Sequence, residues 1–287
     1  MPAPERFGFS EFTTWPWPFA KDVAEYPKHG ADAIEICEFK LAHNDYRQLL
    51  ELRDSGLTPA SVQMKVHSVF VDSMANKPQD PDDRVAAMKD AIAHSAPYLP
   101  PETAFVVITG VPPDGNFRKT ADRTVEALRE LGAHAAAHGM RIAFEPLNPV
   151  NIHTDTSVWY LDQGIDLVER VGHPAVGICI DTWNVWQTPH LRETIQRCGD
   201  RIFLVQLSDW KTPRSTADRY SLGDGEIPLR DVVRWIRDTG YQGAWIVEIL
   251  SSYHLPGSLW KSDLDDVLER NYRAFTALFD ETGTTTK

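Results

Sequence analysis

The chain has 287 residues and a formal net charge of −12 at pH 7, with 41 acidic residues against 29 basic ones. This length fits one large domain or two modest ones. We expect no nucleic-acid partner, because such proteins need clustered Lys and Arg to displace the counterions of the phosphates. We also expect no membrane partner, because no apolar run could span a bilayer and no basic-then-apolar leader opens the sequence.

Three cysteines, Cys37, Cys179 and Cys198, are far apart in the sequence and form no CxxC pair. Neither a disulfide framework nor a cysteine-rich zinc site is therefore predicted. A reducing cytoplasm is the default location for such a chain. The sequence does not indicate whether the chain forms a homo-oligomer.

Short apolar runs alternate with longer amphipathic segments along the chain, and no change in composition marks a linker. The apolar runs predict eight strands, at 6–10, 33–38, 60–67, 104–109, 140–145, 175–181, 201–206 and 244–249. The amphipathic segments predict helices at 19–28, 44–55, 81–97, 119–138, 157–171, 190–199, 228–239 and 262–279. Gly139 and Gly240 stand just past two of these helices, where a left-handed residue commonly ends a helix.

Eight strand-then-helix units predict a parallel sheet closed into a (β/α)8 barrel, also called a TIM barrel. We expect a single domain over residues 1–287, with a polar tail at 280–287. A doubly wound open sheet is the alternative. The chain lacks the GxGxxG signature that is typical of that fold. Its nearest glycine pair, Gly223 and Gly225, does not follow a strand directly.

Four consecutive expected strands end on a polar side chain that follows a run of apolar residues: Glu145, Asp181, Gln206 and Glu248. Since such barrels build their active sites at the C-terminal ends of the strands, these four side chains are expected to converge in the barrel mouth. Period-two counting places the residues two positions earlier inside the barrel: Ala143, Cys179, Leu204 and Ile246. Phe203 belongs to the alternate set, which is expected to pack under the helices.

Three carboxylates close together repel one another unless a cation compensates their charge. A divalent ion held by Glu145, Asp181, Gln206 and Glu248 would remove the conflict. Oxygen-only ligands suit Mn2+ or Mg2+, with Co2+ as a further candidate. The alternative is that each carboxylate caps a helix or joins an ion pair in its own loop.

The chain resembles the xylose isomerase-like TIM barrels (AP endonuclease family 2), which include sugar isomerases, ketose 3-epimerases and dehydratases. The resemblance rests on GADAIEI at 30–36, FEPLN at 144–148, CIDTWN at 179–184, VQLSD at 205–209, RYSLGDGEIPL at 219–229 and GYQGAWIVEIL at 240–250. It implies that the same four residues ligate a metal. Many epimerase-like members have histidine in place of Gln206 and of Asn184, whereas a glutamine ligand looks more like the 3-dehydroshikimate dehydratases.

The expected chemistry is proton abstraction next to a carbonyl through an enediolate that the metal stabilises, with Glu145 and Glu248 removing and returning the proton. This predicts a sugar or keto-sugar isomerase or epimerase. Loss of a group from the β carbon would instead make the enzyme a dehydratase or lyase, acting on 3-dehydroshikimate or by β-elimination on a keto-glycoside. A non-catalytic barrel that binds a metabolite or a subunit is the third hypothesis, and the presence of both glutamates argues against it.

Five residues are candidates for binding a small carbohydrate or keto-sugar substrate: His67, Asn184, Arg219, Glu38 and Trp183. The alternatives are structural: a satisfied histidine for His67, and for Arg219 a surface ion pair with Asp218 or Asp224. Six tryptophans are expected in loops at the mouth, where they either form apolar walls or pack the loops: Trp15, Trp17, Trp183, Trp186, Trp210 and Trp260. Asp209 either orients Gln206 or caps its own loop.

Overall fold

Eight parallel strands form a closed barrel in the computed structural model, which describes residues 5–42, 45–112, 114–212 and 218–280. The strands are β1 (Phe7–Ser10), β2 (Ala33–Cys37), β3 (Thr58–Gln63), β4 (Ala104–Val107), β5 (Arg141–Phe144), β6 (Val176–Asp181), β7 (Ile202–Leu207) and β8 (Trp245–Val247). Because β1 pairs with both β2 and β8, the sheet has no open edge. The (β/α)8 prediction is confirmed and the open sheet is excluded. Residues 281–287 of the expected polar tail lie outside the described residues.

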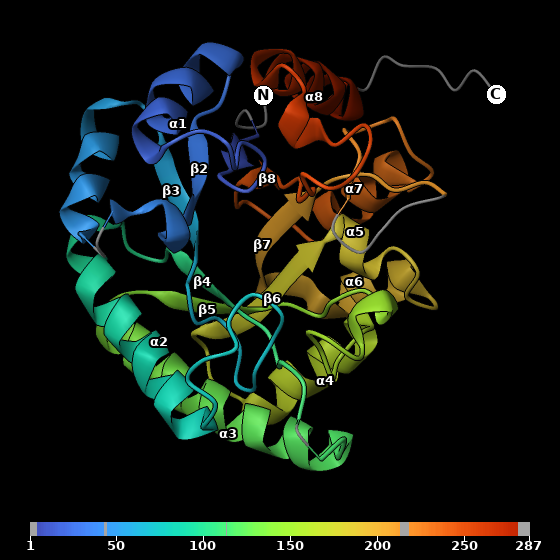
Figure 1. The fold of residues 1–287 in the computed structure, drawn as a ribbon. Helices are drawn as coiled ribbons and strands as arrows, with labels where there is room; N and C mark the ends of the chain where they lie inside the picture. The colour runs from blue at the N-terminus through green and yellow to red at the C-terminus, as the bar shows by residue number, and fades with distance from the viewer. Residues whose placement is uncertain (1–4, 43–44, 113, 213–217, 281–287) are drawn as a thin grey trace.

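The helices form a ring outside the strands, as Figure 1 shows. They are α1 (Phe19–Glu25), α2 (Pro81–Ser95), α3 (Phe117–Ala137), α4 (Leu161–Val171), α5 (Thr182–Val185), α6 (Leu191–Cys198), α7 (Leu229–Arg237) and α8 (Leu264–Phe279). The helix expected at 44–55 is instead a 3₁₀ helix, η4 (Tyr46–Asp54), and the short α5 matches no predicted helix. Gly139 and Gly240 have φ of 74° and 84°, which confirms their place past helix ends.

The barrel interior is filled by small and medium apolar side chains. Its members are Ala33, Ala104, Val106, Ala143, Cys179, Leu204, Ala244 and Ile246, so the period-two prediction is confirmed for the four residues it named. Phe203 was predicted under the helices, and that prediction is wrong. The pairing with β6 slips at this point, so that Phe203 is the extra residue of a bulge and packs against the interior cluster.

The larger part of the core lies between the strands and the surrounding helices, with Phe9, Phe105 and Phe144 among its fully buried side chains. The last helix completes this layer next to the first strand. Phe275 of α8 packs its ring 4.4 Å from that of Phe7 on β1. Figure 1 shows α8 beside α1, so the two ends of the described chain close the ring together.

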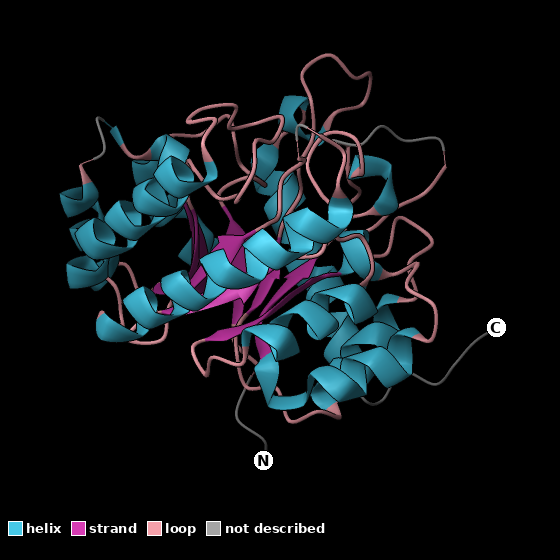
Figure 2. Cartoon of the chain, turned by 90° about the horizontal axis from the view of Figure 1, so that it is seen from below, coloured by secondary structure: helices cyan, strands magenta, loops and turns pink. Residues whose placement is uncertain are grey.

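Long segments follow several strands, among them 64–80, 145–160 and 248–263, which carry little regular structure. Figure 2 shows the strands enclosed by helices and the longer loops gathered on one side of the barrel. These segments lie at the C-terminal ends of the strands, the face where such barrels place their active sites. Among the described residues, no helix combines the length and the apolar character that crossing a membrane requires.

Candidate active site

Three carboxylates meet at the C-terminal ends of the strands. Glu145 follows β5, Asp181 ends β6 and Glu248 follows β8. One oxygen of each lies within 4.8 Å of an oxygen of the other two, and all three side chains are buried. The register explains the convergence, because Asp181 lies opposite Gln206 on β7, which in turn lies opposite a residue two positions before Glu248.

One buried cation faces these carboxylates. Arg219 Nη1 lies 2.8 Å from Asp181 Oδ2 and 2.7 Å from Glu248 Oε2. Its side chain points toward the buried carboxylates, and the residue is only 6% exposed. This orientation does not fit the alternative, in which Arg219 forms an ion pair at the surface. A single guanidinium offsets one of the three negative charges, so the group keeps an excess of negative charge when it is fully ionised.

Burial is the main reason why these carboxyl groups have raised pKa values and keep their protons to a higher pH than usual. It raises the pKa of Asp181 to about 7 and that of Glu248 to about 8, although the Arg219 guanidinium lowers both. The pKa of Glu145 lies well above its usual range, first because of burial and then because of Glu248 and Asp181. A divalent cation would displace these protons, since carboxylates bind metals in their ionised form. The donor chemistry therefore fits a metal ion, and oxygen donors of this kind suit Mg2+ or Mn2+.

Gln206 lies beside this group and is completely buried. Its Nε2 donates at 3.0 Å to Glu248 Oε1 and at 3.0 Å to both carboxylate oxygens of Glu35. Its Oε1 lies 3.0 Å from Cys179 Sγ on β6. Only the oxygen of an amide can ligate a cation, so the role of Gln206 as a fourth ligand depends on which way the amide faces.

A cavity opens above the carboxylates. Glu145 and Glu248 line it, whereas Asp181 does not reach it. Four of the predicted substrate-binding residues line the same cavity: His67, Asn184, Arg219 and Trp183. The Arg219 guanidinium lies over the Trp183 ring at 5.2 Å, so the indole forms part of the wall beside the charged group.

Glu38 was predicted to bind substrate, but it does not line the cavity. Its Oε1 accepts a hydrogen bond of 2.6 Å from the Tyr46 hydroxyl, and its Oε2 accepts one of 2.8 Å from the backbone N–H of Lys65. The residue lies beyond the end of β2, at the start of a short 3₁₀ helix, Glu38–Lys40. The structure therefore gives Glu38 a role in holding loops together.

The third strand ends four residues earlier than expected, at Gln63 and not at His67. Gln63 Nε2 lies 3.3 Å from Glu248 Oε1, and Gln63 lines the cavity. The sequence reasoning missed this residue, although an amide at a strand end was the signal that singled out Gln206. His67 reaches the cavity from the following loop, with Nδ1 3.1 Å from the carbonyl oxygen of Met64.

Two loops meet over the cavity. The backbone N–H of Ser73, in the segment after β3, donates at 2.8 Å to Asp155 Oδ1, in the segment after β5. Asp72 accepts from the fully buried Arg84 of α2 at 3.1 Å and caps the backbone N–H groups of Met74 and Ala75. No sequence pattern indicated this contact, because it joins loops that are far apart in the chain.

The mouth tryptophans mostly pack against other loop residues. Trp183 lines the cavity, and the other five do not. Trp186 packs against Trp210 with ring centroids 5.2 Å apart, and Trp15 stacks on Trp260 at 6.0 Å. The wall hypothesis is therefore supported for Trp183 alone.

Asp209 caps its own loop. Its Oδ1 accepts from the backbone N–H groups of Trp210 and Ile227, and its Oδ2 accepts from those of Gly223 and Gly225. Gly225 is needed there, because a Cβ at this position would lie 2.3 Å from Asp209 Oδ1. Since both carboxylate oxygens serve the loop, the alternative in which Asp209 orients Gln206 is not what the structure shows.

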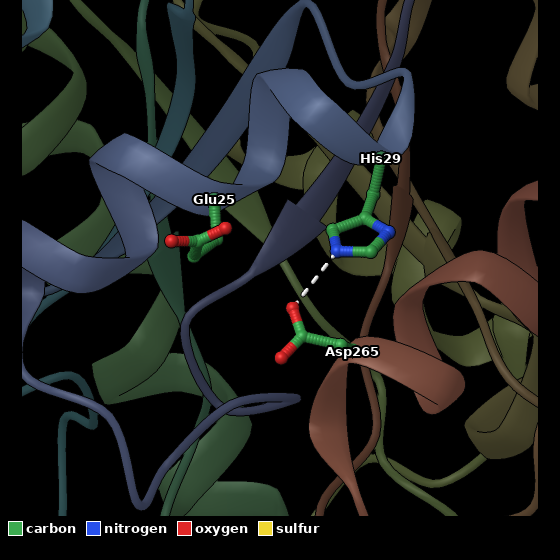
Figure 3. A group of neighbouring side chains, drawn as sticks. All are labelled: Glu25, His29 and Asp265. Carbon is green, nitrogen blue, oxygen red and sulfur yellow. Dashed lines mark hydrogen bonds and ion pairs between the residues drawn. The ribbon is translucent and has the colours of Figure 1, made fainter.

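A second group with ligand atoms close together lies on the surface: Glu25, His29 and Asp265. Figure 3 shows His29 and Asp265 facing each other, and their side chains are 3.0 Å apart. Glu25 pairs with Lys28 at 2.9 Å, so a cation already serves it. Unlike the buried carboxylates, the three side chains of this group are partly or fully exposed, so water weakens the interactions of their charges.

The fold and the buried site together define a (β/α)8 barrel with a carboxylate centre that suits a metal ion at the C-terminal ends of its strands. The model of the xylose isomerase-like TIM barrel family matches residues 23–281, and the chain belongs to that family.

Curated relatives carry two different activities. A 3-dehydroshikimate dehydratase of Pseudomonas putida is 31% identical over 137 residues, which is 44% of this chain and 20% of the relative. A D-psicose 3-epimerase of Enterocloster bolteae is 28% identical over 128 residues, which is 44% of this chain and 39% of the relative. The matched stretch is thus less than half the length of either relative.

The fold is also found among solved structures. The IolI protein, solved with a bound zinc atom, superposes with a TM-score of 0.77 at 18% identity, over 98% of this chain and 100% of that one. At this identity the likeness concerns the fold.

Proposed function

We propose that this protein is a divalent-metal-dependent enzyme that removes a proton next to the carbonyl of a sugar or keto-sugar, acting as an isomerase or epimerase. The observation that carries the proposal is that two buried carboxylates, Glu145 and Glu248, reach one cavity from different strands. An epimerase among the relatives supports the same class of reaction.

Glu145, Asp181 and Glu248 would hold the ion, with Gln206 as a fourth ligand through Oε1. Mn2+ or Mg2+ suits these donors best, and Co2+ is a further candidate. When bound, such an ion acts as a Lewis acid toward a carbonyl and a neighbouring hydroxyl of the substrate.

Proton transfer falls to Glu145 and Glu248, because both line the cavity where a substrate would lie. A general base must lie within reach of the proton that it removes, and both carboxyl groups meet this requirement by lining the cavity. Asn184 holds Glu145 through a hydrogen bond of 2.8 Å, and Arg219 holds Glu248 at 2.7 Å. Each carboxylate is therefore fixed in orientation before a substrate arrives.

A dehydratase is the second candidate. Gln206 favours it, because a glutamine ligand looks more like the 3-dehydroshikimate dehydratases, whereas many epimerase-like members have histidine there. The dehydratase among the relatives supports this reading. The first step would be the same removal of a proton by a glutamate, after which a hydroxyl group would leave from the β carbon and give an unsaturated product.

Proton exchange in D2O tests both candidates. We would incubate the metal-loaded protein with ketoses, 3-ketoglycosides and 3-dehydroshikimate. Deuterium in recovered or epimeric sugar supports the isomerase or epimerase, and an unsaturated product supports the dehydratase instead. Absence of exchange and of product with every compound contradicts the proposal.

Variants connect this chemistry to the site. Glu145→Gln and Glu248→Gln should abolish exchange. Glu11→Gln changes a buried carboxylate that follows β1 and lies outside the cavity, and it should retain exchange.

A further inference from the structure

A fourth buried carboxylate lies next to the proposed metal ligands. Glu35 on β2 is completely buried and lies opposite Ser61 on β3. Ser61 Oγ donates to Glu35 Oε2 at 2.7 Å. Both oxygens of Glu35 accept from Gln206 Nε2 at 3.0 Å, so the carboxylate and the amide face each other.

The chemistry of this pair distinguishes the two ends of the amide. Because both oxygens of Glu35 accept from Nε2, the NH2 end of Gln206 faces Glu35 and the amide oxygen faces away from it. The oxygen is consequently turned toward β6, where Cys179 Sγ lies 3.0 Å away. Cys179 stands two residues before Asp181 and therefore on the same face of that strand.

A carbonyl oxygen has two lone pairs, and the thiol of Cys179 engages only one of them. The other can ligate a cation, and Asp181 ends the same strand that carries Cys179. Glu248 also accepts from Gln206 Nε2, but Glu248 belongs to the carboxylate group that would share its oxygens with the ion. Glu35 is outside that group, and its oxygens accept hydrogen bonds from Gln206 and Ser61.

We propose that Glu35, supported by Ser61, is a positioning residue that holds the NH2 group of Gln206 and thereby turns the amide oxygen toward β6, the strand that ends at Asp181. This inference rests on the proposed metal-dependent function. It gives a role to a buried carboxyl group that the reaction itself does not use.

The experiment measures the Mn2+ dissociation constant in a titration, in which the intensity of the EPR signal gives the concentration of free Mn2+. Glu35→Gln leaves the volume unchanged, but the new amide can face Gln206 in either sense. We expect the dissociation constant to rise about tenfold, as is usual when a partner of a metal ligand is lost. The matched control is Glu11→Gln, which makes the same substitution at a fully buried glutamate after the neighbouring strand β1 and should leave the constant unchanged.

A double-mutant cycle separates positioning from a general structural effect. If Glu35 acts through Gln206, then Glu35→Gln should change Mn2+ affinity little in a Gln206→Leu background. Equal and additive losses in both backgrounds contradict the proposal. The melting temperature of each chelator-treated variant shows whether it is folded, and Ser61→Ala provides a milder change that should weaken Mn2+ binding in the same direction.

The outcomes distinguish this inference from the proposed function. If the wild-type protein binds no divalent ion, the proposed function fails and the inference fails with it. If the wild type binds Mn2+, Glu145→Gln abolishes binding and Glu35→Gln binds as tightly as the wild type, then only the positioning role of Glu35 is overturned.

Discussion

Asn184 Nδ2 donates a hydrogen bond of 2.8 Å to Glu145 Oε1 and thereby ties the end of β6 to the end of β5. The short helix α5 begins directly after Asp181, and Asn184 is one of its buried residues. Asp181 caps that helix by accepting from the backbone N–H of Trp183 at 2.9 Å and also accepts from Asn184 Nδ2 at 2.8 Å. The amide of Asn184 therefore orients two proposed metal ligands at once.

Replacing Asn184 by leucine should destabilise the protein and weaken Mn2+ binding. The change removes one hydrogen bond to Asp181, and it leaves Glu145 Oε1 and the buried backbone N–H of Asn148 without their partner. We expect the free energy of unfolding to fall by about 1–3 kcal/mol, the usual cost of an unsatisfied buried group. Urea unfolding of the chelated protein measures it.

The control for this substitution is Gln187→Leu, which removes a more exposed amide from the same segment. It should leave both stability and Mn2+ affinity close to those of the wild type. Equal stability of Asn184→Leu and wild type would show that Asn184 does not support the site.

The sequence predicted the barrel well because its strands and helices have different apolar periods. It also predicted the convergence of Glu145, Asp181, Gln206 and Glu248, since parallel strands in a barrel end at the same mouth. The element boundaries were less certain. The strand containing Gln63 was predicted to end at His67, four residues too late. Gln63 was therefore not recognised as the polar residue at the strand end.

The remaining features depend on contacts that no local pattern carries. Glu35 lies within β2 and faces Gln206, whereas Glu38 lies in the 3₁₀ helix that follows Cys37 and faces Tyr46. Phe203 turns inward because the pairing with β6 slips next to Gly177, where a Cβ would lie 2.6 Å from the phenyl ring. Such register shifts follow from packing between distant segments and leave the spacing of apolar residues unchanged.

The stability of the metal-free protein should fall as the pH rises from about 4 to about 8. Ordinary carboxyl groups in an unfolded chain have pKa values near 4, whereas burial raises the pKa of Asp181 to about 7 and that of Glu248 to about 8 in the folded protein. Within that window the folded state holds more protons than the unfolded state, so a rise in pH favours unfolding.

Melting temperatures of chelator-treated protein across this pH range measure the effect. Glu248→Gln removes one of these groups and should make the fall with pH shallower. Added Mn2+ should raise the melting temperature more at pH 8 than at pH 6, because the ligands must lose their protons to bind it. A steeper fall in Glu248→Gln than in the wild type contradicts the assignment.

Arg84 anchors the loop that covers the cavity, and its removal should be costly. Its guanidinium is fully buried and donates to Asp72 at 3.1 Å and to the backbone carbonyl oxygens of Ser68, Ala75 and Pro78 at 2.8 Å. Arg84→Met leaves the Asp72 carboxylate buried without its cation, which costs about 3–5 kcal/mol of unfolding free energy. Chemical denaturation measures the loss, and Lys89→Met on the exposed face of the same helix is the control.

We expect the buried carboxylates to bind a metal ion and the surface group of Glu25, His29 and Asp265 to bind none tightly. The surface group pairs its own charges, with His29 and Asp265 3.0 Å apart and Glu25 held by Lys28. The buried group has one arginine for three carboxylates, and this imbalance favours an added divalent ion. We therefore expect one tightly bound Mn2+ per chain in an equilibrium titration.

His29→Ala should leave that stoichiometry unchanged, whereas Asp181→Asn should remove the tight site. Loss of the tight site in His29→Ala, with Asp181→Asn still binding, would place the metal on the surface and contradict the active-site assignment.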